Sequence, residues 1–195
     1  MLALLVVVAL TCTVRGLNFR PDTVDSLDVP AYMGLWYQMY ANAASMDTFE
    51  KDAFCSTALY GINGDGTLSV HNDARIGSQN GTDYPISGYA YYDNDGKEPG
   101  QLMVHLEGVS RDSTYWITAL GPVNNGFYDW AIVSDSTGVF LYVLARDYKT
   151  FASKYESEVL AIVKDQGFTG LKKPIAEYQG DDCLYESVAR KKNMK

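Results

Sequence analysis

Eight short runs rich in tyrosine, valine and isoleucine follow one another along the first three quarters of this chain. Clusters of turn-forming residues, such as "NGDG", "SQNGTD" and "DNDGKEPG", separate the runs. Short strands at regular spacing, joined by tight turns, predict an all-β antiparallel barrel or sandwich and not a fold that alternates helices with strands. The expected strands cover residues 35–43, 54–61, 67–74, 82–92, 101–108, 114–120, 127–134 and 139–146.

The periodicity changes from that of a strand to that of a helix after Arg146. In "SKYESEVLAIVKDQG", Ser153 and Glu156 match a capping box, and Gly167 is a suitable stop. The apolar face at helical spacing consists of Tyr155, Val159, Ile162 and Val163. The pattern predicts one amphipathic helix over about 153–166, packed against the outside of the sheet.

The beginning of the chain, "MLALLVVVALTCTV", is apolar but too short to span a bilayer. Residues 1–16 are predicted to be a cleaved secretory signal; a retained anchor or a lipid-modified Cys12 are the alternatives. Without Cys12, the cysteines that remain are Cys55 and Cys183, and two cysteines in a secreted domain usually pair. Such a bond would stabilise the fold by about 4 kcal/mol through loop entropy and tie the C-terminal tail to an early strand.

The charge of the chain limits its partners. The 16 basic and 24 acidic residues give a net charge of −8, which repels phosphate backbones and anionic lipid surfaces. Nucleic acid is therefore not an expected partner. No segment after the signal is apolar enough to cross a membrane, so the sequence predicts a secreted, extracellular product without membrane insertion.

The number of strands bears on function, because the interior of an eight-stranded barrel is either just filled by side chains or just wide enough for one small ligand. Alternation in "QLMVHLEG" places Leu102, Val104 and Leu106 on the inner face. In "GVFLYVLAR", Phe140 and Tyr142 share a face, but both faces of this strand are largely apolar. In "YWITAL", alternation alone does not decide which face points inward.

Two motifs carry a family resemblance. "YMGLWYQM" resembles the G-x-W-Y motif that opens the first strand of lipocalins, and "FLYVLAR" resembles the strand that ends in their arginine. The resemblance implies that Gly34, Trp36 and Arg146 close one end of the barrel, with Trp36 lying across it and Arg146 stacked over the indole as a cation–π pair.

The resemblance extends from Asp28 to Cys183. "FEKDAFCSTALYGINGDGTLSVHND" is similar to the second and third strands of the apolipoprotein D and bilin-binding protein branch, which pairs a second-strand cysteine with one near the C-terminus. It implies one lipocalin-like domain over 17–195, with the barrel at about 34–146 and a tail at 167–195. One departure is the loop "LGPVNNGFYDW", which is longer than in the family and borders the closed end, so a different arrangement of the plug is expected there.

Matching the strands to the family settles the ambiguous faces and implies an apolar, aromatic cavity with a few polar groups. The predicted ligand-binding residues are Tyr60, Leu68, Val70, Asn72, Ile86, Val104, Leu106, Tyr115, Ile117, Asp135, Phe140 and Tyr142. Such a lining suits a lipid, sterol, retinoid or pigment oriented by one or two hydrogen bonds. The alternative is that these side chains simply fill the core of the barrel.

The leading hypothesis is a secreted carrier of a small hydrophobic molecule that is not an enzyme and needs no cofactor. One alternative is a thiol-dependent lipid isomerase, as in some lipocalins, with Cys55 as the nucleophile; pairing with Cys183 would silence it. Another is an interaction or matrix module that uses the outer surface or loops, with tyrosines of "SGYAYYDND" as anchors.

Other candidate sites are few. His71 and His105 fall on the expected outer face without metal-ligand spacing, so no metal site is predicted. The segment "DNDG" superficially resembles a calcium loop, but Leu102 occupies the position of the bidentate glutamate, and the segment is interpreted as a hairpin turn. Asn80 in "NGT" is a predicted N-glycosylation acceptor.

Overall fold

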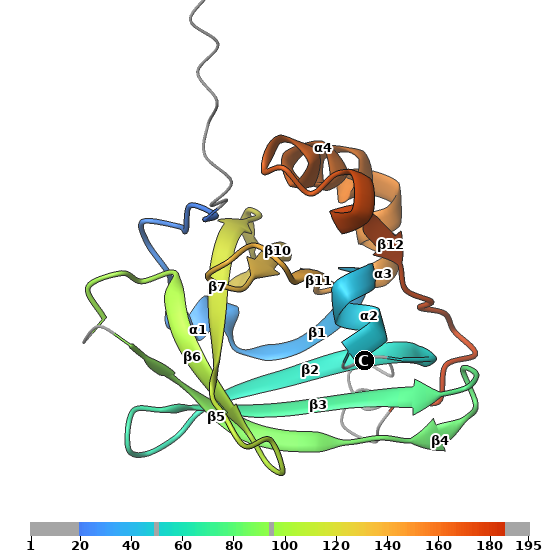
Figure 1. The fold of residues 1–195 in the computed structure, drawn as a ribbon, viewed down its shortest axis with the longest axis horizontal. Coiled ribbons are helices and arrows are strands. Elements are labelled where there is room, and N and C mark those ends of the chain that lie inside the picture. The colour runs from blue at the N-terminus through green and yellow to red at the C-terminus, as the bar shows by residue number, and fades with distance from the viewer. Residues whose placement is uncertain (1–19, 49–50, 94–95, 186–195) are drawn as a thin grey trace, which may run out of the picture.

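The structure is a closed antiparallel β-barrel. The computed structural model describes residues 20–48, 51–93 and 96–185, and the predicted signal peptide at residues 1–16 lies outside this range. Eight strands follow one another around the barrel in the order β1-β2-β3-β5-β6-β7-β10-β11, and β11 pairs with β1 to close it. Figure 1 shows the strands curving around the interior, with the C-terminal helix α4 on the outside. The predicted barrel with one outer helix is confirmed.

Each barrel strand lies within or close to one predicted run. The barrel strands are β1 (Gly34–Asn42), β2 (Ala53–Ile62), β3 (Leu68–Ile76), β5 (Ile86–Tyr92), β6 (Gln101–Leu106), β7 (Ser113–Leu120), β10 (Trp130–Ser134) and β11 (Leu141–Ala145). The run at 82–92 is interrupted at Pro85, between the short β4 (Thr82–Asp83) and β5. Proline has no N–H to donate to a ladder, which explains the break.

Several short elements were not predicted. They are α1 (Val29–Tyr32), α2 (Ala43–Thr48), β8 (Val123–Asn124), the 3-10 turn η2 (Gly170–Lys172) and β12 (Pro174–Ala176). The strand predicted at 127–134 is divided into β9 (Phe127–Tyr128) and β10. The strand β12 pairs with the second half of β1, and the β8–β9 hairpin occupies part of the loop that departs from the family pattern.

The helical region begins earlier than predicted. It consists of α3 (Tyr148–Thr150), the π-helical turn η1 (Phe151–Tyr155) and α4 (Glu156–Asp165). Asp147 is the N-cap, because its carboxylate accepts a hydrogen bond from the Thr150 N–H at 2.7 Å. The predicted capping box is wrong: Ser153 lies inside the π-helical turn, where its hydroxyl donates to the Lys149 carbonyl at 2.9 Å. An aspartate directly after the last strand was the better start signal.

Two hydrophobic clusters lie on opposite sides of the barrel wall. The outer cluster joins the helical region to the outer face of the barrel and includes Tyr37, Ile132, Val143, Phe151, Tyr155, Val159 and Val163. Val159 and Val163 are fully buried, and burying each valine stabilises the fold by about 1.5–3 kcal/mol. This confirms the predicted apolar face of the helix. The inner cluster surrounds Trp36 and contains Tyr32, Ile117, Val133 and Leu144.

The C-terminal strap, residues 177–185, runs from β12 to the beginning of β2. The backbone N–H of Glu177 donates to the Met39 carbonyl of β1, and the N–H of Cys55 in β2 donates to the Tyr178 carbonyl, both at 2.9 Å. The predicted disulfide between Cys55 and Cys183 is confirmed. The strap therefore bridges β1 and β2 by backbone hydrogen bonds and by a covalent bond.

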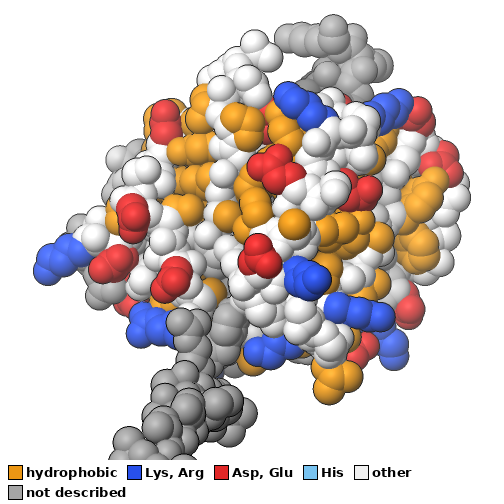
Figure 2. Space-filling view, turned by 90° about the horizontal axis from the view of Figure 1, so that it is seen from above, with side chains coloured by type: hydrophobic (Ala, Val, Ile, Leu, Met, Phe, Trp, Pro, Cys, Tyr) orange, Lys and Arg blue, Asp and Glu red, His pale blue; other side chains and the backbone are white. Residues whose placement is uncertain are grey.

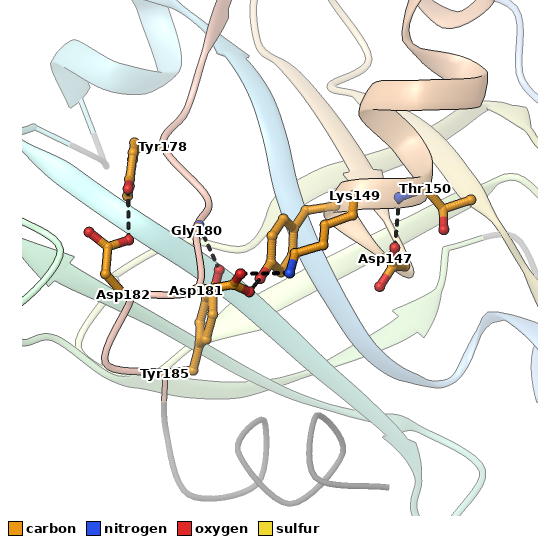
Figure 3. A network of polar contacts seen from close by, with 9 residues as sticks. Asp147, Lys149, Thr150, Tyr178, Gly180, Asp181, Asp182 and Tyr185 are labelled. Carbon is orange, nitrogen blue, oxygen red and sulfur yellow. Dashed lines mark hydrogen bonds and ion pairs between the residues drawn. The ribbon is translucent and has the colours of Figure 1, made fainter.

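Side chains at the surface also hold the strap. The Asp181 carboxylate accepts hydrogen bonds from the Tyr148 hydroxyl and the Lys149 ammonium, each at 2.6 Å, which link it to α3 (Figure 3). Because this ion pair is exposed to solvent, it contributes little to stability. Elsewhere on the surface, acidic and basic side chains are interspersed with exposed hydrophobic ones (Figure 2).

The first residue of the strap, Glu177, has a buried carboxyl group. Glu177 is 7% exposed, and its carboxylate accepts hydrogen bonds from the Gln38 amide at 2.5 Å and from the Ser56 N–H at 2.8 Å. Burial raises the pKa of Glu177 from the ordinary value of 4.5 to about 6, although the hydrogen bonds from Ser56 and Gln38 lower it. The folded protein therefore holds this proton more tightly than the unfolded chain does.

We expect Glu177 to make stability fall as the pH rises. Its contribution is fully present below pH 4.5 and is lost as the pH rises through about 6, a decrease of about 2 kcal/mol in the free energy of unfolding. Glu177→Gln should remove this decrease, while the exposed Glu158→Gln in α4 should retain it. Urea unfolding at pH 4, 5, 6 and 7 measures the difference; equal slopes for the two variants would contradict the expectation.

Candidate functional site

A cavity of about 630 Å³ occupies the interior of the barrel. Eleven of the twelve predicted ligand-binding residues lie on its wall, and they come from six strands and the β10–β11 turn. They are Tyr60, Leu68, Val70, Asn72, Ile86, Val104, Leu106, Tyr115, Asp135, Phe140 and Tyr142. The interior is therefore hollow, although contact of these residues with a ligand stays a prediction.

Ile117 is the exception among the twelve. It faces the inner cluster but has no exposed surface, and it is not on the cavity wall. Its backbone N–H donates to the carbonyl of Gly100, the residue before β6, whereas Tyr115 pairs with Leu102 one step inside β6. Ile117 thus lies one layer closer to the end closed by Trp36, where other side chains cover it. Alternation predicts a face of a strand but not a depth.

Trp36 and Arg146 close one end of the cavity. Trp36 is fully buried, and the Arg146 guanidinium carbon lies 3.6 Å from the centroid of its ring. The predicted cation–π pair is confirmed. Gly34 has a φ of +90°, a backbone conformation that favours glycine, and a Cβ there would lie in ordinary contact with Arg146 Nη1, at 3.4 Å.

Four backbone carbonyls fix the Arg146 guanidinium. Nε donates to the Tyr128 carbonyl at 3.1 Å and Nη1 to that of Leu35 at 2.8 Å, while Nη2 donates to those of Ala31 and Tyr32 at 2.9 Å each. Burial lowers the pKa of Arg146 to about 10, so the group stays charged at neutral pH. One side chain thus joins β1, β9, β11 and α1.

The β8–β9 hairpin completes the closed end. Phe127 places its ring 5.1 Å from the Arg146 guanidinium carbon, in addition to the Trp36 contact. The Tyr128 hydroxyl accepts a hydrogen bond from the Asp28 N–H at 3.0 Å, which ties the hairpin to the start of α1. The longer loop, noted as a departure from the family pattern, thus adds a second aromatic ring to the plug.

Three tyrosine hydroxyls meet in the interior. The Tyr115 hydroxyl lies 2.6 Å from that of Tyr32 and 3.2 Å from that of Tyr60. Tyr60 and Tyr115 were predicted, but Tyr32 was missed because it precedes the first strand. Asp28 caps α1 and Pro30 lies in its first turn, a signal for the start of a helix that ends at Tyr32, just before β1. The Trp36 indole N–H donates to the Tyr32 carbonyl at 2.9 Å.

Two other predicted polar residues, Asn72 and Asp135, differ in whether their oxygen atoms already accept hydrogen bonds. Asn72 Oδ1 is buried without a hydrogen bond to any described residue, although the residue lies on the wall. The Asp135 carboxylate instead accepts from the backbone N–H groups of Thr137, Val139 and Phe140. Burial raises its pKa, but these hydrogen bonds outweigh burial, and the net pKa is lowered. Asp135 chiefly organises the β10–β11 turn.

The cavity extends to the end opposite Trp36. In an antiparallel barrel successive turns lie at alternate ends, so α2 and the turns after β3, β6 and β10 lie away from Trp36. The residues of the wall that belong to these segments are Thr48, Tyr84, Val109, Arg111, Asp112, Asp135 and Phe140. This end is more polar and charged than the middle of the cavity.

No group of three metal-binding side chains occurs within residues 20–48, 51–93 and 96–185. His105 Nδ1 lies 2.8 Å from an Asp112 carboxylate oxygen, and His71 Nδ1 lies 2.9 Å from the Ser87 hydroxyl. Part of "DNDG" lies outside the described residues. Among the helices of the described chain, none has the length and apolar character needed to cross a membrane.

The fold and the site define a class of protein: an antiparallel β-barrel with an internal cavity, a tryptophan–arginine plug at one end and an outer C-terminal helix. The chain belongs to the lipocalin-like family, since the family model of the lipocalin-like domain matches residues 27–174.

Curated relatives agree with this assignment. Temperature-induced lipocalin-1 of Arabidopsis thaliana is 25% identical over 151 residues, which are 74% of this chain and 76% of the relative. Apolipoprotein D of Mus musculus is 30% identical over 134 residues, which are 66% of this chain and 65% of the relative.

Solved structures share the fold at lower identity. Insecticyanin from Manduca sexta has a TM-score of 0.64 and 17% identity, over 87% of this chain and 91% of its own. The amine-binding protein of Rhodnius prolixus in its tryptamine complex has a TM-score of 0.57 and 17% identity, over 90% and 93%. Japanin from Rhipicephalus appendiculatus, bound to cholesterol, has a TM-score of 0.53 and 13% identity, over 80% and 100%.

Proposed function

We propose that this protein is a secreted carrier that binds one small, mainly hydrophobic molecule inside the barrel. The observation that carries the proposal is the cavity of about 630 Å³, a volume in the range of small-molecule sites, with a largely apolar wall. Apolar ligand surface buried there contributes roughly 25 cal/mol per Å² to affinity. The tryptamine and cholesterol complexes of two structural neighbours support the proposal.

An extracellular location forms part of the proposal. The Cys55–Cys183 bond supports it, because disulfides persist chiefly in oxidising compartments. Residues 17–195 would form the single mature domain. Asn80 is exposed in the turn between β3 and β4, as a glycosylation acceptor requires.

The disulfide also argues against thiol catalysis. A thiolate is the nucleophile in such reactions, and Cys55 has no free thiol while it is bonded to Cys183. We therefore propose a binding protein and not an enzyme. A thiol titration of the unreduced protein should find neither cysteine reactive.

We expect ligand binding to depend on the free volume of the barrel. Val104→Phe/Leu106→Phe adds two rings to the inner face of β6 and should weaken the tightest ligand at least tenfold, because the ligand and the added rings compete for one space. The measurement is quenching of tryptophan fluorescence during titration with a fatty acid, a sterol, a retinoid and a bilin.

The matched control is Met103→Phe, which adds a ring to the same strand at a position that is not on the cavity wall. It should leave the dissociation constant within about twofold. Equal binding by the filled variant and the wild type would show that the ligand does not occupy the barrel. Failure of all four ligands to bind the wild type would count against a carrier of these classes.

A further inference from the structure

The three tyrosine hydroxyls have three O–H protons but make only two hydrogen bonds with one another. Each phenol supplies a single O–H donor, and the two contacts made by Tyr115, with Tyr32 and Tyr60, employ two of the three protons. Whichever way these two hydrogen bonds point, one proton remains. None of the three hydroxyls makes a further hydrogen bond to a described residue, so the cluster always has one donor to offer.

The cluster that offers this donor lies at the wall of the cavity. Tyr32 is 2% exposed, while Tyr60 and Tyr115 are partly buried, and all three line the cavity wall. The rings of Tyr32 and Tyr60 are stacked with centroids 5.9 Å apart, and Tyr32 also contacts Trp36, with centroids 5.2 Å apart. The cluster is therefore packed against the plug, at the inner end of the cavity.

The charge near the cluster is positive. Burial raises the pKa of Tyr60 to about 12, against the opposing effects of the Tyr115 hydrogen bond and the Arg146 charge, so its phenol remains a donor at neutral pH. Burial likewise raises the pKa of Tyr115 well above its ordinary value. The nearby positive charge of Arg146 favours a partially or fully negative ligand atom at this end.

The carboxylates on the wall are already engaged elsewhere. Asp112 accepts from His105 and Tyr91, and Asp135 accepts from the backbone of its own turn, both at the opposite end of the barrel. Asp73 lies 3.9 Å from the Arg75 guanidinium. The inner end thus presents hydroxyl protons beside a cation, whereas the carboxylates lie nearer the other end or in ion pairs.

We propose that the cluster of Tyr32, Tyr60 and Tyr115 selects ligands that carry a carbonyl or carboxylate oxygen at one end. This oxygen enters the cavity first and accepts a hydrogen bond from the spare phenol O–H group. An ammonium head group cannot accept that hydrogen bond, and it would bring a second positive charge toward Arg146. The inference rests on the proposed carrier function and narrows its ligand class.

The test compares two ligands with the same chain length and different head groups. Decan-2-one and decylamine each compete at pH 7 with the apolar fluorophore N-phenyl-1-naphthylamine, which reports occupancy of the cavity. We expect the wild type to bind the ketone at least tenfold more tightly than the amine. Tyr32→Phe/Tyr60→Phe/Tyr115→Phe keeps the three rings but removes every hydroxyl of the cluster, and it should weaken the ketone about three- to tenfold while leaving the fluorophore within about twofold.

The outcomes separate this inference from the carrier function. If the fluorophore and both ligands bind the wild type with similar affinity, the carrier stands and the selection of an oxygen acceptor is wrong. If the triple variant binds the ketone as tightly as the wild type does, the cluster is not the contact, and the inference fails. If neither the fluorophore nor any ligand binds the wild type, both proposals are overturned. The wild-type comparison requires no variant to fold.

Discussion

Replacing Arg146 with alanine should lower the free energy of unfolding by about 3–5 kcal/mol. The substitution removes four charged hydrogen bonds and leaves the carbonyls of Leu35, Ala31, Tyr32 and Tyr128 without that donor. It also removes the cation above the Trp36 ring. Urea unfolding followed by tryptophan fluorescence measures the loss. The emission of Trp36 should also change, because the guanidinium no longer lies over its ring.

Two control variants separate the contributions of Arg146. Arg146→Lys retains the positive charge, but one ammonium group does not reproduce the planar fork that reaches four carbonyls, so we expect it to recover less than half of the loss. Arg20→Ala removes a cation that lies 4.4 Å from the centroid of the Trp116 ring on the exposed side of the barrel, and should cost less than about 1 kcal/mol. Equal losses at Arg20 and Arg146 would mean that the hydrogen bonds contribute little.

The sequence predicts the barrel well because strand alternation and turn chemistry are local signals. The runs around β3, β6 and β7 are bounded by glycine, asparagine and aspartate, and the inward positions Val104 and Leu106 follow from a period of two. The plug is a long-range contact of Trp36 with Arg146, 110 residues apart, and only the family resemblance identified it. Periodicity alone does not specify which residues meet across the barrel.

Depth and irregular segments were harder to predict for physical reasons. Ile117 has the expected face but lies below the cavity, because depth depends on the stagger between β6 and β7. The helix starts at Asp147 because a capping aspartate after the last strand prevails over the Ser153 pattern. Tyr32 lies on a four-residue helix, too short to show a hydrophobic period. The proposed selective group thus combines two residues that the family resemblance placed on the inner face with one that it did not identify.

Removing the disulfide should have an effect as large as that of Arg146. Cys55→Ala/Cys183→Ala opens a link between residues 128 positions apart, and the loop-entropy model gives a loss of about 4–5 kcal/mol in the free energy of unfolding. The measurement is urea unfolding of the oxidised wild type and of the double variant. The slope of the free energy against urea should rise, because the unfolded chain is no longer held in a loop and exposes more surface.

The reduced wild-type protein is the control for this expectation, since it loses the covalent link but keeps both sulfur atoms. Cys55 and Cys183 are 2% and 8% exposed, so alanine also removes some packing, which the reduced protein retains. If chain entropy dominates, the reduced protein and the double variant should be destabilised to within about 1 kcal/mol of each other. A reduced protein as stable as the oxidised one would show that hydrogen bonds alone hold the strap, through Met39, Tyr178 and the buried Glu177.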